Sequence, residues 1–231
     1  MKLLAFETSA KAGSVALLED GVLLAESYQN TGLTHSQTLM TMAEDLLKSC
    51  GITAVDAVAV ASGPGSFTGV RIGVAAAKGY AWGAELPLYG VSTLEAMALN
   101  MGIYNGYVLP VMDARRSQVY NGVFHCEKGV MTRLCEDRAI SLQELGEEIK
   151  NLSEPIFLVG DGSNLCYNTL KDTVPALVLP PEHKMHQRAA GVALGAMARI
   201  DRGETGDGAA LQPNYLRLSQ AERERLAREQ K

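Results

Sequence analysis

Two separated stretches near the start of the chain have the composition of turns that bind phosphate. Residues 7–9, Glu-Thr-Ser, end the first apolar run, and hydroxyl groups in such a turn can hold a phosphate. Residues 62–73, SGPGSFTGVRIG, place a Gly-Pro-Gly loop before a predicted helix, whose first backbone N–H groups can face an anion. The candidate phosphate-loop positions are Glu7, Thr8, Ser9, Gly63 and Gly65.

Neither stretch matches a common nucleotide-binding motif. No Gly-Lys-Ser/Thr follows the loop in 62–73, and its third glycine comes too late for a Gly-x-Gly-x-x-Gly pattern. Threonine and serine in a tight turn also commonly satisfy backbone groups locally. Gly69, Gly73 and Ala77 lie four residues apart and leave one helix face nearly flat. That face suits either internal packing or the close approach of another helix.

The sequence offers no recognisable set of catalytic or metal-binding residues. His35, His125, His183 and His186 form no His-x-x-x-His pair on a predicted helix. The four cysteines form no Cys-x-x-Cys pair, which argues against a zinc ribbon or a dithiol redox site. A Gly-x-Ser-x-Gly elbow, typical of serine hydrolases, is also missing. We therefore predict no catalytic residue and no metal ligand.

The elements that would position the first two turns follow from hydrophobic periodicity. Alternating or continuous apolar runs predict strands, and apolar residues at helical spacing predict helices. In the first half we expect strands at 2–8, 13–18, 22–29, 55–61 and 88–91, and helices at 34–50, 66–83 and 92–101. The predicted order is therefore βββαβαβα.

The second half nearly repeats this order. We expect strands at 107–113, 118–126, 130–135 and 156–159, and helices at 141–151, 163–170 and 186–201. Two α/β units, each with a mixed sheet, follow from the repetition. The expected division is a first lobe at 1–104, a second and less regular lobe at 105–205, and a C-terminal segment with a charged tail at 206–231 that can pack back on the first lobe.

Composition limits the class of protein. The 231 residues are 47% hydrophobic and 20% charged, as in ordinary globular proteins, and the net charge of −5 argues against an autonomous nucleic-acid binder. We see no apolar run long enough for a signal peptide or a membrane span, so we expect a cytoplasmic protein without membrane contact. The tail at 216–231 alternates Arg and Glu, which suits a solvated helix or a segment that contacts RNA or a partner.

Five separated motifs together resemble the TsaB (YeaZ) family. They are Glu7-Thr8-Ser9, Thr34-His35-Ser36, the loop at 62–73, Asp113-Ala114-Arg115-Arg116 and Gln118-Val119-Tyr120. The resemblance covers nearly the whole chain. It implies an α/β protein with the two-lobed actin/Hsp70/sugar-kinase-like (ASKHA) fold and a duplicated βββαβα core with mixed sheets.

The resemblance also implies that the chain is a paralogue of the TsaD-type transferases. Those enzymes use a metal and a nucleotide-like intermediate. Their His-x-x-x-His helix is replaced here by STLEAMA at 92–98, and their Ser-Gly-Gly turn by DARR at 113–116. VGDGSN at 159–164 echoes their adenosine turn only in part, and Asp161 adds a negative charge there. The implied protein is non-catalytic and needs no cofactor, and its ATP or ADP binding is at most vestigial.

The function that the resemblance implies is activation of a TsaD-type transferase through a heterodimer. That enzyme forms N6-threonylcarbamoyladenosine next to the anticodon of tRNAs that read codons beginning with A. A TsaE-type ATPase is the implied third member, a homodimer is implied as an alternative pairing, and tRNA is reached only through the complex. Two alternatives remain at this stage: an autonomous ATP-dependent kinase or transferase of ASKHA fold, and a glycoprotease-like peptidase.

The family pairs through helices of the first lobe, which here correspond to 34–50 and 67–83. The candidate dimer-interface residues are Leu39, Met42, Ala43, Leu46, Val70, Val74, Ala77 and Lys78. One face of each helix must also cover its own sheet. An internal role for any of these residues therefore stays open.

Overall fold

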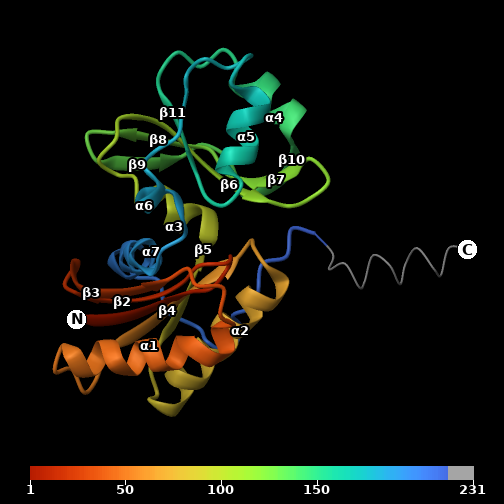
Figure 1. Ribbon diagram of the computed structural model, residues 1–231. Helices are drawn as coiled ribbons and strands as arrows, with labels where there is room; N and C mark the ends of the chain where they lie inside the picture. The colour runs from red at the N-terminus through yellow and green to blue at the C-terminus, as the bar shows by residue number, and fades with distance from the viewer. Residues whose placement is uncertain (218–231) are drawn as a thin grey trace, which may run out of the picture.

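Two mixed β-sheets form the two lobes of the molecule, and the computed structural model describes residues 1–217 (Figure 1). The first sheet has the strand order β3-β2-β1-β4-β5, with β1 antiparallel to β2 and parallel to β4. Its region comprises β1 (Lys2–Glu7), β2 (Gly13–Glu19), β3 (Val22–Gln29), α1 (His35–Ser49), β4 (Ala57–Gly63), α2 (Phe67–Gly83), β5 (Leu88–Ser92) and α3 (Thr93–Leu99). The predicted order βββαβαβα is confirmed. Within the described part of the chain, no helix is both long and apolar enough to cross a membrane.

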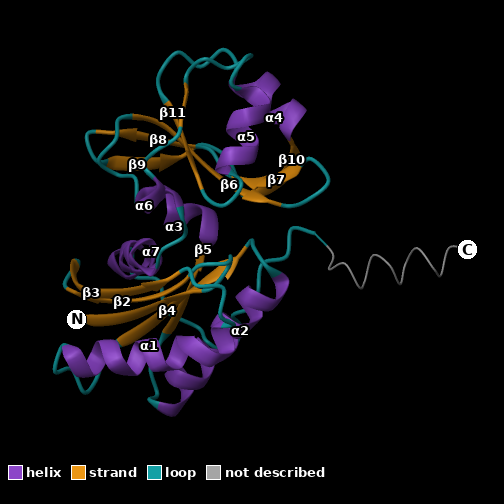
Figure 2. Ribbon diagram, in the orientation of Figure 1, coloured by secondary structure: helices purple, strands orange, loops and turns teal. Residues whose placement is uncertain are grey.

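The central strand β1 is buried on both faces, which explains its unbroken apolar run. Leu4 and Phe6 pack in a cluster with residues of α1 and α2, whereas Leu3 and Ala5 pack in a second cluster with residues of α7 (Ala189–Asp201). Figure 2 shows α1 and α2 on the outer side of the first sheet, and α3 and α7 on the side that faces the second lobe. Strands covered on both faces read as continuous rather than alternating apolar segments.

The apolar stripes of α1 and α2 face the first sheet. This corrects the prediction that they form a dimer interface, because the sheet itself needs this cover. Lys78 is only partly buried, and its Nζ donates to the Ala209 carbonyl at 3.4 Å. The buried members of the predicted interface, all in one core cluster with β1, β2 and β4, are Leu39, Met42, Ala43, Leu46, Val70, Val74 and Ala77.

The second sheet follows the path β10-β7-β6-β11-β12, with β8 pairing β6 and β9. Two helices, α4 and α5, belong to its hydrophobic core cluster. The elements are β6 (Gly106–Asp113), β7 (Gln118–Asn121), β8 (Phe124–Glu127), β9 (Val130–Arg133), β10 (Arg138–Ser141), α4 (Leu142–Ile149), β11 (Ile156–Val159), α5 (Ser163–Leu170), β12 (Leu177–Val178) and α6 (Glu182–Met185).

The predicted strand 118–126 is in fact two strands, and this expectation was wrong. Asn121 pairs with Val111 of β6, whereas Phe124 pairs with Val108 of the same strand. The buried Asn121 side chain donates to the carbonyl groups of Pro110 and Gly122, and this interrupts the ladder between the two strands. The elements β10, β12 and α6, which have two to four residues each, were not predicted.

Helix α7 belongs to the first sheet, so the predicted second lobe at 105–205 extends too far. Ala189, Val192, Ala193 and Ala196 pack against β1, β2 and β4. The Ala189 backbone N–H donates to Ser14 Oγ at 2.8 Å and anchors the start of the helix. Small side chains allow this close seating, which sequence periodicity alone does not assign to one lobe or the other.

The segment 206–217 lies along the first lobe. Gly206 and Gly208 lie next to Leu88, and Leu211 packs against the core cluster of α1 and α2. The charged tail predicted at 216–231 lies almost wholly outside the described residues, which end at Arg217.

Candidate functional site

The first predicted phosphate turn, between β1 and β2, is fully buried. Glu7, Thr8 and Ser9 are each 0% exposed. The Ser9 backbone N–H donates to Glu7 Oε1 at 2.5 Å, and the Thr8 hydroxyl donates to the Gly69 carbonyl at 2.8 Å. The polar groups of this turn therefore bond to one another and to helix α2.

The Gly-Pro-Gly loop packs directly on that turn. The Ser66 backbone N–H donates to the Ser9 carbonyl at 2.6 Å, and a Cβ added at Gly65 would lie 2.5 Å from the same oxygen. In α2, a Cβ at Gly69 would overlap the Thr8 carbonyl, and one at Gly73 would overlap the Thr8 hydroxyl. The structure thus brings the two predicted turns together, and three glycines make their close contact possible.

Gly63 has a different neighbour from the other glycines of the loop. Its φ is +108°, and an added Cβ would lie 2.6 Å from the carbonyl oxygen of Asn214. The Asn214 backbone N–H donates to the Ser62 carbonyl at 2.6 Å. The glycine at this position makes room for the C-terminal segment.

The corresponding turn of the second lobe joins β6 to β7 without any glycine. Arg115, Arg116 and Ser117 have φ values of 63°, 56° and 56°, a region that side chains rarely adopt. Asp113 Oδ1 accepts from the Arg115 backbone N–H at 2.7 Å, and both arginine side chains are exposed. Side chains therefore occupy the surface of a turn that would need a bare backbone to approach a phosphate closely.

The partial adenosine motif lies between β11 and α5. The Gly160 backbone N–H donates to the Met185 carbonyl, and the Gly162 backbone N–H to the Val111 carbonyl. Gln187 Nε2 donates to Asp161 Oδ1 at 3.1 Å. Burial raises the pKa of Asp161 above its ordinary value, while the Gln187 bond acts in the opposite direction.

These turns line a cleft between the two lobes with a volume of about 680 Å³. Ser9, Asp113 and Asp161 are among its lining residues. Burial raises the pKa of Glu7, which lies behind Ser9, to about 7, and the Asp161 charge adds to the shift. Glu7 Oε2 has no hydrogen-bond partner among the described residues. The base of the cleft thus holds two carboxyl groups whose charged forms are disfavoured.

The histidines of the described chain lie apart. His35 Nε2 lies 2.8 Å from the Ala10 carbonyl oxygen, where the ring covers the β1–β2 turn. His125 and His186 each contact a glutamate. Within residues 1–217, no group of three or more His, Cys, Asp or Glu side chains is arranged to hold a metal ion.

A second candidate surface is the side of α1 and α2 that points away from the sheet. Trp82 is 87% exposed and Met40 45% exposed, although tryptophan is among the more buried residue types on average. Beside Trp82 lies a hollow of about 470 Å³, lined mainly by apolar atoms of α2 and of residues 208–209. We call this surface the outer α1–α2 face and define it by the exposed residues Met40, Thr41, Glu44, Ala75, Gly79 and Trp82.

Sequence reasoning missed both Trp82 and the C-terminal residues that line the cleft. Hydrophobic periodicity does not indicate whether a single tryptophan near a helix end is exposed. Asn214, Tyr215 and Arg217 reach the cleft from the far end of the chain, and Arg217 contacts a residue 103 positions away. No local pattern could have predicted such a contact.

Comparison with known proteins gives a consistent picture. The family model for TsaD, tRNA N6-adenosine threonylcarbamoyltransferase, matches residues 29–225. The chain is 32% identical to the tRNA threonylcarbamoyladenosine biosynthesis protein TsaB of Bacillus subtilis over 225 residues, which cover 96% of each protein. The solved structure of YeaZ from Pseudomonas aeruginosa aligns with a TM-score of 0.74 at 29% identity, covering 93% of this chain and 99% of that one.

A more distant structure bears on the fold alone. The ROK hexokinase of Thermus thermophilus aligns with a TM-score of 0.50 at 12% identity, covering 88% of this chain and 100% of the hexokinase. The predicted two-lobed ASKHA fold is therefore confirmed.

Replacing Gly69 by Ala tests the contact between α2 and the β1–β2 turn. The added methyl group would overlap the Thr8 carbonyl, so we expect a loss of about 1–3 kcal/mol in the free energy of unfolding. Gly79→Ala in the same helix meets nothing within 4 Å and should instead stabilise by about 0.4–1 kcal/mol. Urea unfolding followed by circular dichroism measures both. Equal effects of the two substitutions would contradict the packing described.

Replacing Glu7 by Gln tests the buried carboxyl. The Glu7 pKa is about 7 in the folded chain against an ordinary value of 4.5, so the folded state holds this proton to higher pH than the unfolded state. Raising the pH from about 5 to about 7 should therefore lower stability, by at most about 1.4 kcal/mol per pH unit for one proton. In Glu7→Gln this loss should be smaller. Chemical unfolding at several pH values measures the slopes, and identical slopes would show that Glu7 ionises normally.

Proposed function

The chain belongs to the TsaB (YeaZ) family, and from this membership we propose that it is a non-catalytic partner that activates a TsaD-type transferase by forming a heterodimer with it. Relatives in this family are named tRNA threonylcarbamoyladenosine biosynthesis proteins. The chain takes part in that process. The partner would supply catalysis and this chain would supply a docking surface. Contact with tRNA and with a TsaE-type ATPase would arise only within the complex.

The observation that carries the proposal is the outer α1–α2 face. Trp82 presents a nearly free indole ring next to an apolar hollow, and exposed aromatic residues of this kind are enriched among the residues that dominate binding. The face lies on the side of the first sheet opposite the second lobe (Figure 2), so a partner can reach it without disturbing the interlobe cleft. An accessible apolar surface of this type favours protein association.

The side chains of α2 on this face are small. Ala75 and Gly79 lie one turn apart on its exposed side, and an added Cβ at Gly79 would meet nothing within 4 Å. The separation of two packed helices depends on the side chains at the contact, so small residues let a partner helix approach closely. The same surface would serve a homodimer in the free protein. Homodimer and heterodimer would then exclude one another.

The geometry of the cleft supports a role without a bound nucleotide. The loop at 63–66 packs on the β1–β2 turn and bonds to its Ser9 carbonyl, and side chains crowd the β6–β7 turn. We therefore propose that the chain needs no cofactor and that its phosphate-loop positions are degenerate. These features also count against an autonomous kinase or transferase.

Charging the outer α1–α2 face should separate this chain from its partner. Ala75→Glu places an unpaired carboxylate in the centre of the proposed contact, and Trp82→Ala removes its largest apolar side chain. We expect each substitution to weaken binding of a TsaD-type transferase at least tenfold, which corresponds to about 1.4 kcal/mol. Isothermal titration calorimetry of the purified pair measures the affinity.

The matched control is Val130→Glu, which adds the same charge to a second-lobe strand at a residue that is 66% exposed. It should leave the affinity unchanged. Wild-type affinity in both Ala75→Glu and Trp82→Ala would show that the partner binds elsewhere.

A further inference from the structure

The last described residues form a strap, residues 211–217, that leaves the first lobe and ends on the second. Leu211 packs on the core cluster of α1 and α2, and Asn214 bonds to the Ser62 carbonyl through its backbone N–H. In Figure 1 this segment, drawn in blue, runs beside α2 and then turns toward the second lobe. Its residues 214–217 line the interlobe cleft.

The strap is fixed to the first lobe at Tyr215. The Tyr215 ring stacks on the Phe67 ring with centroids 4.8 Å apart, and Arg71 Nε donates to the Tyr215 hydroxyl at 2.7 Å. The Arg71 guanidinium also lies 3.8 Å from the Phe67 ring centroid, which is a cation–π distance. Both partners belong to the first turns of α2, at the rim of the cleft.

The strap is fixed to the second lobe at Arg217, two positions further on. Arg217 Nη1 donates to the Ala114 carbonyl at 2.5 Å and lies 3.4 Å from the Arg115 carbonyl. Both carbonyl groups belong to the β6–β7 turn. Because guanidinium is charged at every physiological pH, the bond to Ala114 is charge-assisted and persists across the working range. Tyr215 and Arg217 thus join the two lobes over a very short span of chain.

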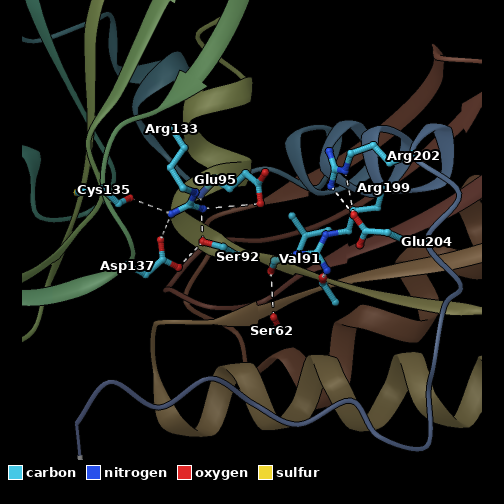
Figure 3. Close-up of polar contacts among 11 residues, drawn as sticks. Ser62, Val91, Ser92, Glu95, Arg133, Cys135, Asp137, Arg199, Arg202 and Glu204 are labelled. Carbon is cyan, nitrogen blue, oxygen red and sulfur yellow. Dashed lines mark hydrogen bonds and ion pairs between the residues drawn. The ribbon is translucent and has the colours of Figure 1, made fainter.

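A second bridge between the lobes joins side chains at the end of β5 and in α3 to side chains at the end of β9 and in the β9–β10 loop (Figure 3). Ser92 Oγ donates to Asp137 Oδ2 at 2.5 Å, and Arg133 Nη1 donates to Asp137 Oδ1 at 2.6 Å. Arg133 also lies 3.7 Å from a carboxylate oxygen of Glu95. Rotation of one lobe against the other would have to break this network and the strap and to shift α3 against the apolar cluster that it shares with β6 and β8.

We propose that the strap is a built-in clamp across the interlobe cleft, which holds the lobes in one orientation. It bridges the two lobes as a ligand bound between them would. While Tyr215 and Arg217 are docked, the cleft stays at its present width. Release of the strap lets the β6–β7 turn move away from α2. The inference concerns the isolated chain and does not depend on the partner.

The distance between the lobes tests the clamp directly. Nitroxide labels at the exposed residues Thr53 and Gln143, attached through a noncanonical amino acid, report that distance by double electron–electron resonance. We expect Arg217→Ala to at least double the width of the wild-type distance distribution, because it removes the described strap contact with the second lobe. The double variant Tyr215→Ala/Arg217→Ala should broaden it at least as much. Circular dichroism checks that both variants fold.

The matched control is a chain that ends at Arg217, which keeps the strap and lacks residues 218–231. It should retain the wild-type distribution. A broadened distribution in this control would assign the clamping to the deleted residues and overturn the proposal. An unchanged distribution in the folded Arg217→Ala variant would also overturn it, because the lobes would then be held without the strap.

Discussion

The close seating of helix α2 on the β1–β2 turn is the contact on which the rest of the structure depends. Gly65 and Gly69 allow their backbone to approach the Ser9 and Thr8 carbonyl groups, and Gly73 allows α2 to approach the Thr8 hydroxyl. A Cβ at any of the three glycines would collide with those atoms. This seating holds the loop at 63–66 against the β1–β2 turn, and both line the interlobe cleft. It also turns the opposite side of α2, with Trp82, toward solvent. One packing constraint thus bears on two of our proposals, the degenerate phosphate loop and the surface for the partner.

Two carboxyl groups and the C-terminal segment of the chain determine the character of the interlobe cleft. Desolvation raises the pKa of the buried Glu7 carboxyl and of the Asp161 carboxyl that lines the cleft, and a bound anion would disfavour their charged forms further. Residues 214–217 line the cleft and bond to both of its sides. The C-terminal segment of the chain thus bridges the two sides of the cleft.

Much of the first lobe was predictable because its signals are local. The apolar run of β1 and the helical spacing in α1 and α2 required only short-range patterns. The direction of the stripes was not predictable, because Leu39 and Val70 suit a core and an interface equally well. Burial in one core cluster decided between them. The return of α7 to the first sheet and the docking of Arg217 depend on contacts between distant parts of the chain, which leave no pattern in the sequence.

The central claim is that this chain activates a transferase without catalysing the reaction itself. The most direct measurement is threonylcarbamoyl transfer to unmodified tRNA by a TsaD-type transferase and its TsaE-type ATPase, with and without this chain. The account predicts transfer only in the mixture that contains the chain, and none by the chain alone. Equal transfer in its absence, or transfer by the isolated chain, would contradict the account.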